Sequence, residues 1–187
     1  MSEFFEDLVF DKSEVLFESN EFQSCIFKNC KFEGLSLRGA KLFDCKFINC
    51  NLSNTALTNS IWSNNEFTDC KLIGVNWSAV KKISEMTFSK CQLNYSSFQN
   101  LKSPYIKVLD SNCISVDFSD CDLNHCDFTG SDLTECFFSN CNLKYGKFVN
   151  VISHSIDLSL NSLKNACFDL QASTYLLEKY GIKVVYE

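Results

Sequence analysis

The side chains of this chain best suited to chemistry are its 12 cysteines. Thiols bind zinc, form disulfides or act as nucleophiles, and each role requires its own geometry. Ten of them occupy one position, two residues before a large apolar residue: Cys25, Cys30, Cys45, Cys50, Cys70, Cys91, Cys121, Cys126, Cys136 and Cys141. Their shared position indicates that they belong to a repeat, so the elements that carry them have to be identified first.

Large apolar residues recur at every fifth position from Phe17 to Trp77. The series then shifts by one residue, resumes at Phe88 and continues through Leu158 and Leu163 to Phe168, with exceptions at Ser103, Val108, Cys113 and Ser153. Neither an α-helix nor a regular strand has this period. Inward residues that alternate by two and by three predict an extended chain with one corner per repeat, and therefore stacked coils paired through their backbones.

This pattern, a central Leu or Phe preceded two residues earlier by a small residue, resembles the pentapeptide-repeat family over residues 17–168. The resemblance implies an all-β, right-handed quadrilateral β-solenoid with twenty residues per coil. It also implies stacked columns of thiols, such as Cys30, Cys50 and Cys70, or Cys25 with Cys45, or Cys121 with Cys141. We divide the chain into a lead-in and first coil edge (1–16), the solenoid (17–168, with a register break at 78–87) and a C-terminal cap and dimerisation tail (169–187).

Straight columns of thiols disfavour zinc, because four ligands have to converge on the ion, and His125 and His154 occupy outward or loop positions. Disulfides between column neighbours are an alternative, although parallel Cβ vectors fit the bond poorly. We interpret the cysteines as small, reduced core residues and expect no metal and no cofactor. The sequence contains no phosphate-binding glycine loop, nucleophile elbow or HExxH motif, so we expect no enzymatic activity.

The N-terminal apolar stretch from Phe4 to Phe10 is short and contains Glu6 and Asp7, so we predict no signal peptide. No apolar run reaches membrane-spanning length. We therefore expect a cytoplasmic protein with reduced thiols and no membrane association.

The net charge is −6, and its distribution is uneven. Residues 22–107 are mainly basic, whereas residues 108–143 contain no Lys or Arg and form an acidic belt: Asp110, Asp117, Asp120, Asp122, Asp127, Asp132 and Glu135. Four of these acids recur every fifth residue, which predicts that they lie on four faces. Clustered charge of one sign attracts an oppositely charged partner. We expect no direct binding of nucleic acid, which requires a basic surface, but a partner that itself binds DNA.

Two further sites stand out. One is the interruption formed by Ala79, Val80, Lys81, Lys82, Ile83, Ser84 and Glu85, which is either a functional loop or a bulge that relieves strand mismatch. The other is an outward column of Tyr105, His125 and Tyr145, which is either a contact patch or a set of rings that only stack on each other. Outward polar columns such as Asn29, Asn49 and Asp69, or Asn100, Asp120 and Asn140, predict structural side-chain ladders.

The pattern changes after Phe168, where a short amphipathic helix is predicted to end at Gly181 and a terminal strand to cover Ile182–Tyr186. The apolar residues of this tail suggest a homodimer interface. They are Leu176, Leu177, Tyr180, Ile182, Val184, Val185 and Tyr186.

The tail motifs Gln171-Ala172-Ser173, Leu176-Leu177-Glu178 and Gly181-Ile182 resemble the C-terminal signature of the Qnr-type quinolone-resistance and microcin-immunity proteins. That resemblance implies a tail-to-tail dimer, similar to B-DNA in shape and charge, that engages DNA gyrase or topoisomerase IV and counteracts poisons such as fluoroquinolones. The alternative is a pentapeptide-repeat scaffold that mediates another protein–protein interaction.

Overall fold

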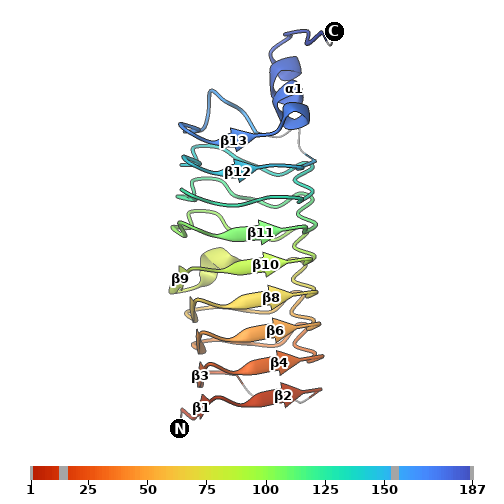
Figure 1. Ribbon diagram of the computed structural model, residues 1–187. Helices are drawn as coiled ribbons and strands as arrows, with labels where there is room; N and C mark the ends of the chain where they lie inside the picture. Colours follow the sequence, from red (N-terminus) through yellow and green to blue (C-terminus); the bar gives the residue numbers. More distant parts are fainter. Residues whose placement is uncertain (1, 13–16, 153–155, 186–187) are drawn as a thin grey trace.

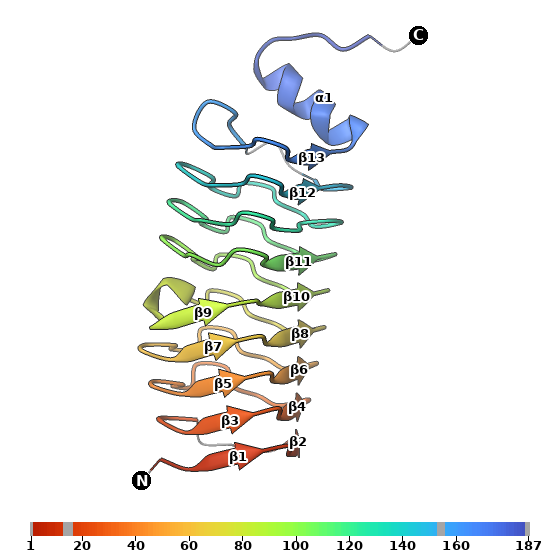
Figure 2. The same cartoon turned by 60° about the vertical axis from the view of Figure 1, so that its left-hand side comes forward.

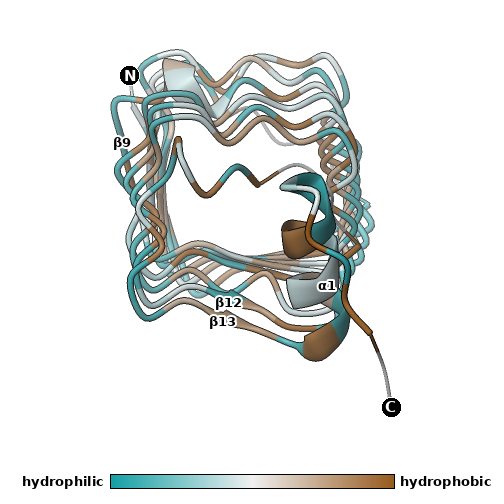
Figure 3. Ribbon diagram, turned by 90° about the horizontal axis from the view of Figure 1, so that it is seen from above, coloured by the Kyte–Doolittle hydropathy of each residue, from teal (hydrophilic) through white to brown (hydrophobic). Residues whose placement is uncertain are grey.

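One residue in each repeat turns the chain through a corner. Two positions after most central residues the backbone adopts positive φ, as at Asn49 (52°), Asp120 (59°) and Gly74 (67°). Asn, Asp and Gly tolerate this left-handed conformation best, which explains why they are frequent there. A corner after every five residues folds the extended chain into coils with a square outline, seen along the axis in Figure 3.

The computed structural model describes residues 2–12, 17–152 and 156–185. Short parallel strands form where straight segments of successive coils pair, with the N-terminus at one end of the rod and the C-terminus at the other (Figure 1). The fold class is therefore confirmed as a β-solenoid with one C-terminal helix. The strands are β1 (Phe4–Glu6), β2 (Val9–Asp11), β3 (Glu21–Gln23), β4 (Ile26–Lys28), β5 (Lys41–Phe43), β6 (Lys46–Ile48), β7 (Ile61–Ser63), β8 (Glu66–Thr68), β9 (Lys82–Ser84), β10 (Thr87–Ser89), β11 (Lys107–Leu109), β12 (Lys147–Phe148) and β13 (Cys167–Phe168).

The strands stack in three sheets on the walls of the rod, in the orders β1-β3-β5-β7-β9, β11-β10-β8-β6-β4-β2 and β12-β13 (Figure 2). Most paired residues lie 20 positions apart, as in Asn29 and Asn49. The first coil is shorter, because Phe5 pairs with Phe22. β1 and β2, within the segment interpreted as a lead-in, are thus regular strands of the first coil.

The central residues fill the interior of the rod. Phe27, Phe47 and Phe67 are fully buried and stack with ring centroids 4.7 Å apart in both pairs. The series holds as far as Phe148, and Leu163 and Phe168 are partly buried against the core. Leu158 is an exception, since it is 41% exposed in a turn outside the wall, so its assignment as an inward residue is wrong.

The small residues two places before each centre do more than fill space. Backbone bonds between coils use neither the carbonyl of the central residue nor the N–H at the small position. At some corners these two groups bond to each other within the coil, as the Cys126 N–H does to the Leu123 carbonyl at 2.9 Å. At others a polar small side chain of the next coil satisfies both groups. Asn65 accepts the N–H of Cys45 at 2.9 Å and donates to the carbonyl of Leu42 at 3.0 Å. Ser131 does the same for Ser111 and Val108, at 3.1 and 2.8 Å.

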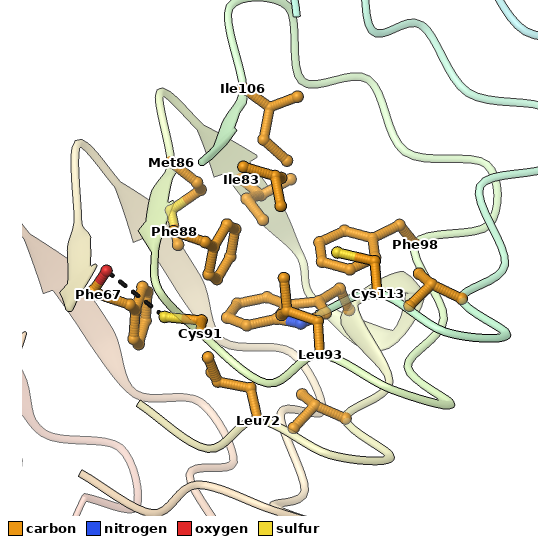
Figure 4. Packing of buried hydrophobic residues seen from close by; sticks show 14 of the residues in the cluster. Phe67, Leu72, Ile83, Met86, Phe88, Cys91, Leu93, Phe98, Ile106 and Cys113 are labelled. Carbon is orange, nitrogen blue, oxygen red and sulfur yellow. Dashed lines mark hydrogen bonds between the residues drawn. The ribbon is translucent and has the colours of Figure 1, made fainter. Parts of the chain in front are cut away.

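Cysteine thiols make the same bonds at this position. Cys70 accepts from the N–H of Cys50 and donates to the carbonyl of Phe47, each at 3.4 Å. Figure 4 shows the equivalent bond from Cys91 to the carbonyl of Phe67, 3.5 Å long. Burial raises the pKa of Cys45 to about 12, which keeps that thiol protonated at neutral pH as a donor. The ten cysteines at this position and Cys113 are buried and unbridged, whereas Cys167 is exposed.

Helix α1 (Leu170–Lys179) covers the last coil. Asp169 caps the helix by accepting a hydrogen bond from the N–H of Ala172 at 2.8 Å. Ala172 and Thr174 are the buried residues of the helix. Residues 182–185 have no regular secondary structure, so the strand predicted there is not formed in the described part of the tail. A strand needs a neighbour, and the described residues of one chain provide none at this end.

Cys70 tests the dual role of the small position. Valine fits there, as at Val75 and Val116, but its side chain can neither accept nor donate a hydrogen bond. We expect Cys70→Val to lower the free energy of unfolding by roughly 1–3 kcal/mol, because two buried backbone groups lose their partner. Cys70→Ser, which retains both bonds, should stay within about 1 kcal/mol of the parent protein. The measurement is urea unfolding under reducing conditions, and equal loss in both variants would contradict the role.

Candidate functional site

The acidic belt occupies two kinds of position. Asp117, Asp122, Asp127 and Asp132 immediately precede four consecutive central residues and lie on four faces, half-buried. Their carboxylates accept backbone N–H groups two residues later, for example from Ser119 at 2.8 Å to Asp117. These acids therefore contribute to the fold as well as to the surface charge.

The other three belt acids stand at corners and are exposed: Asp110, Asp120 and Glu135. Asp120 accepts from Asn140 at 2.9 Å, and Glu135 accepts from Ser115 at 2.9 Å. Each bond involves one carboxylate oxygen and leaves the charge at the surface. These acids are the belt residues most available to a partner.

Lysines partly neutralise one face of the belt. The Lys147 Nζ lies 3.5 Å from the Asp127 carboxylate, and Lys107 precedes Asp127 in the same column, where the two residues pair through their backbones. This ion pair is exposed on the lysine side and adds little stability.

The column of Tyr105, His125 and Tyr145 forms a stacked ladder. Ring centroids are 4.9 Å apart between Tyr105 and His125 and 4.7 Å apart between His125 and Tyr145, with planes within 12° of parallel. All three residues have positive φ, which is uncommon for bulky side chains. The rings cover one another's faces and leave their edges exposed.

The interruption is a bulge and not a projecting loop. A 3-10 turn, η1 (Trp77–Ala79), precedes it, and Lys82–Ser84 form β9 within the wall. The N–H of Lys81 donates to the carbonyl of Ser60, while Lys82 pairs with Ile61. Two residues of this coil, Lys81 and Lys82, therefore lie opposite one residue of the preceding coil, which defines a β-bulge. Of the residues proposed as a loop, only Val80 and Lys81 lie between these two elements.

Within the tail, Leu177, Tyr180, Ile182 and Val185 are exposed, whereas Leu176 packs against the core. Val184 is half-buried, and Tyr186 lies outside the described residues. Leu170, which is 69% exposed at the start of α1, was not among the candidate interface residues.

The sequence analysis also missed Phe137 (60% exposed) and Ile152 (58% exposed), which border the belt in the same columns as Asp117 and Asp132. The sequence did contain a signal for these exposed residues, because each is a large apolar residue at a position that is occupied by an aspartate one coil below.

The described residues contain no group of three or more His, Cys, Asp or Glu side chains arranged to hold a metal ion. Across the same ranges, no helix combines the length and apolar composition needed to cross a bilayer. The surface thus offers charge and exposed side chains for contact with partners.

Comparison with known proteins gives a consistent result. The family profile described as "Pentapeptide repeat region" matches residues 20–82 and 81–148. No curated protein sequence matches significantly. Among solved structures, a trypsin-treated variant of QnrB1, a plasmid-mediated fluoroquinolone resistance protein, is 17% identical with a TM-score of 0.68, over 99% of this chain and 98% of that one. A second trypsin-treated variant of QnrB1 is 17% identical, with a TM-score of 0.66 over 100% of both chains. Full-length QnrB1 is 19% identical, with a TM-score of 0.56 over 96% of this chain and 100% of that one.

The attachment of the C-terminal cap should depend on pH. Asp157 accepts hydrogen bonds from Ser159 at 2.5 Å and from the Tyr180 hydroxyl at 2.7 Å, and these bonds hold the pKa of Asp157 well below its ordinary 3.8. A carboxyl group with a lowered folded pKa stabilises above its ordinary pKa and loses that effect as pH falls through the folded value.

We expect Tyr180→Phe to raise the pKa of Asp157 towards its ordinary value. The measurement is the NMR titration midpoint of the Asp157 carboxyl carbon, with Tyr145→Phe as a control distant in sequence. A midpoint unchanged by Tyr180→Phe would show that the hydroxyl does not hold the cap through Asp157.

Proposed function

The chain belongs to the pentapeptide repeat family, and from that premise we propose that it is a non-catalytic binder of a type II topoisomerase, DNA gyrase or topoisomerase IV. It acts by presenting an acidic rod in place of DNA and so modulates the enzyme or counteracts poisons such as fluoroquinolones. The observation that carries this proposal is the acidic belt around a rigid solenoid. The likeness in fold to QnrB1 supports it.

The charge density of the belt favours DNA mimicry. Residues 108–143 cover a little under two coils, which at about 4.8 Å per coil is roughly 9 Å of the rod. Duplex DNA of that length carries about five charges. The belt holds seven acids, one of which is paired with Lys147. A basic DNA-binding groove would therefore meet a similar negative charge.

A protein of this kind would work in the cytoplasm, where its target acts and where thiols remain reduced. Charge-driven binding should weaken steeply as the salt concentration rises. Neutralising the exposed corner acids should reproduce that loss without removing the structural carboxylates.

The test is a gyrase supercoiling and cleavage assay with a fluoroquinolone present. We expect micromolar protein to change the yield of drug-stabilised cleavage. The triple variant Asp110→Asn, Asp120→Asn, Glu135→Gln should need roughly tenfold more protein for the same effect at low salt.

The matched control neutralises three exposed acids outside the belt: Asp44→Asn, Glu66→Gln and Asp69→Asn. It should behave as the parent protein. No effect of the parent on gyrase or topoisomerase IV at micromolar concentration would rule out the proposed function.

We further propose that the tail forms a homodimer. Leu177, Tyr180, Ile182 and Val185 leave apolar surface exposed at the end of the rod, and symmetric pairing would cover it. Such a dimer would double the length of the acidic rod.

Val185 tests the dimer because it is 82% exposed and lies outside α1. We expect Ile182→Glu with Val185→Glu to give a monomer of about 21 kDa by light scattering, with unchanged circular dichroism. The control Phe137→Glu, exposed on the wall, should leave the mass unchanged. A parent protein that is already monomeric would contradict the dimer.

The second candidate is a scaffold for another protein, favoured by the exposed ladder. Tyr105 is 57% and Tyr145 is 46% exposed, and such aromatics are common at interfaces. A salt-insensitive complex lost on alanine substitution of Tyr105, His125 and Tyr145, with gyrase unaffected, would select this function.

A further inference from the structure

The wall of the solenoid is open beside β9. Within the described chain, no backbone hydrogen bond joins residues 78–85 of one coil to residues 98–105 of the next. Bonds close the wall on both sides, from the Trp77 N–H to Ser97 at 2.8 Å and from the Lys107 N–H to Met86 at 2.9 Å. We call the interval between these bonds the wall opening.

The upper edge of the opening is bonded normally to the coil above it. The N–H groups of Ser103 and Tyr105 donate to the carbonyls of Asp122 and Asn124 at 3.0 and 2.9 Å, and the N–H of Asp122 donates to Leu101 at 2.8 Å. The missing bonds are therefore specific to one junction between coils.

Two local features explain the opening. The bulge at Lys81 places an extra residue in the lower coil, which displaces its upper edge. In the upper coil the sizes of the inward residues are exchanged, because Leu101 occupies the small position and Ser103 the large one. Neither edge then has the shape that pairs elsewhere in the rod.

The opening leaves three backbone donors without a partner among the described residues. Elsewhere the N–H groups of a central residue and of the corner residue after it donate to carbonyls of the following coil, as those of Leu123 and His125 do. The N–H of the residue before a centre donates to a carbonyl of the preceding coil, as that of Lys41 does. By this equivalence the N–H groups of Ile83 and Glu85 face the opening from below and that of Lys102 from above.

Two buried side chains beside the opening are also unsatisfied. The indole Nε1 of Trp77 and the Oγ of Ser103 are buried without a hydrogen-bond partner among the described residues. Trp62, one coil earlier, donates its Nε1 to Ser60 at 2.8 Å. Unpaired buried polar atoms are rare in folded proteins. Both residues belong to the coils that flank the opening, and their side chains lie in the core behind it.

A groove of about 420 Å³ lies at this place, lined by Ser78, Val80, Lys81, Lys82, Ile83, Gln99, Asn100, Leu101 and Lys102. Its three lysines are exposed, and no acid lies within ion-pair distance of them among the described residues. Lysines elsewhere pair between coils, as Lys41 does with Glu21 at 2.9 Å and Lys46 with Glu66 at 3.1 Å. Lys82 and Lys102 occupy equivalent positions in successive coils, and like charges placed so repel unless an anion lies between them.

We propose that the wall opening binds a phosphate-type oxyanion. Backbone N–H groups and lysine ammonium groups that converge on one recess are the donors that bind phosphate in proteins. Lys82 and Lys102 supply the charge, and the N–H groups of Ile83, Glu85 and Lys102 supply the directed hydrogen bonds. The site is separate from the acidic belt residues and does not depend on the topoisomerase proposal.

The test is an amide NMR titration of the full chain with inorganic phosphate at low ionic strength. We expect saturable shifts of the Ile83, Glu85 and Lys102 amide signals that sodium chloride at the same ionic strength does not produce. The variant Lys82→Gln with Lys102→Gln should bind at least roughly tenfold more weakly, because it loses two charge-assisted contacts.

A second groove provides the matched control. It has a volume of about 430 Å³ and is lined by Lys31 and Lys71, but also by Glu33 and Asp69, and its wall is closed by the bond from Lys71 N–H to Cys50 at 2.9 Å. Lys31→Gln with Lys71→Gln should leave phosphate binding unchanged. Equal weakening by both double variants, or equal shifts with chloride, would overturn the proposal.

A short DNA duplex distinguishes the source of the anion. Shifts at the three amides with phosphate alone identify a free oxyanion, and shifts with both ligands identify any accessible phosphoryl group; both results support the site. No shift with either ligand would overturn it.

Discussion

The coils are held together by a recurring bridging interaction, in which a polar small side chain two places before a central residue satisfies two backbone groups of the coil below. The carbonyl of the central residue and the N–H at the small position take no part in the backbone bonds between coils. Both groups lie beside an apolar interior, where an unpaired polar atom is costly. Asn65, Ser131 and Cys70 meet this requirement with different atoms in the same arrangement. A short side chain that both accepts and donates therefore suits this position, and a protonated thiol is one solution, although apolar residues such as Ala40, Val75 and Val116 also occupy it.

Because each coil is fixed to the next in this way, surface residues 20 positions apart are held in straight columns. One column changes sign over three coils: Lys82 and Lys102 line the wall opening, and Asp122, bridged to Lys102, belongs to the acidic belt. A basic recess thus lies directly beside an acidic girdle on a rod with little freedom to rearrange. This arrangement would give a charged partner one preferred orientation along the axis, since electrostatic complementarity fixes register more than affinity.

Much of this could be predicted from the sequence. The five-residue period predicted that Phe27, Phe47 and Phe67 are buried, and the twenty-residue coil implied by the family resemblance predicted the thiol columns and the ladder of Tyr105, His125 and Tyr145. The bonding role of the cysteines was missed because they were interpreted only as small core residues, whereas a buried thiol can also accept and donate hydrogen bonds. Leu158 was misplaced because the period gives no sign of where the last coil departs from the wall. The wall opening was not foreseen, since the effect of one inserted residue depends on whether two separate edges still fit. The roles proposed for the belt, the ladder and the tail remain predictions.

The account holds that backbone pairing between coils, which runs from β3 through to β8, is interrupted at the wall opening. Amide hydrogen exchange followed residue by residue tests this directly. The N–H groups of Lys46 and Glu66, bonded to the coil below at 2.9 and 3.0 Å, should exchange only through global unfolding, whereas those of Ile83, Glu85 and Lys102 should exchange much faster. Equal protection of both groups would show that the wall is closed throughout and would contradict the account.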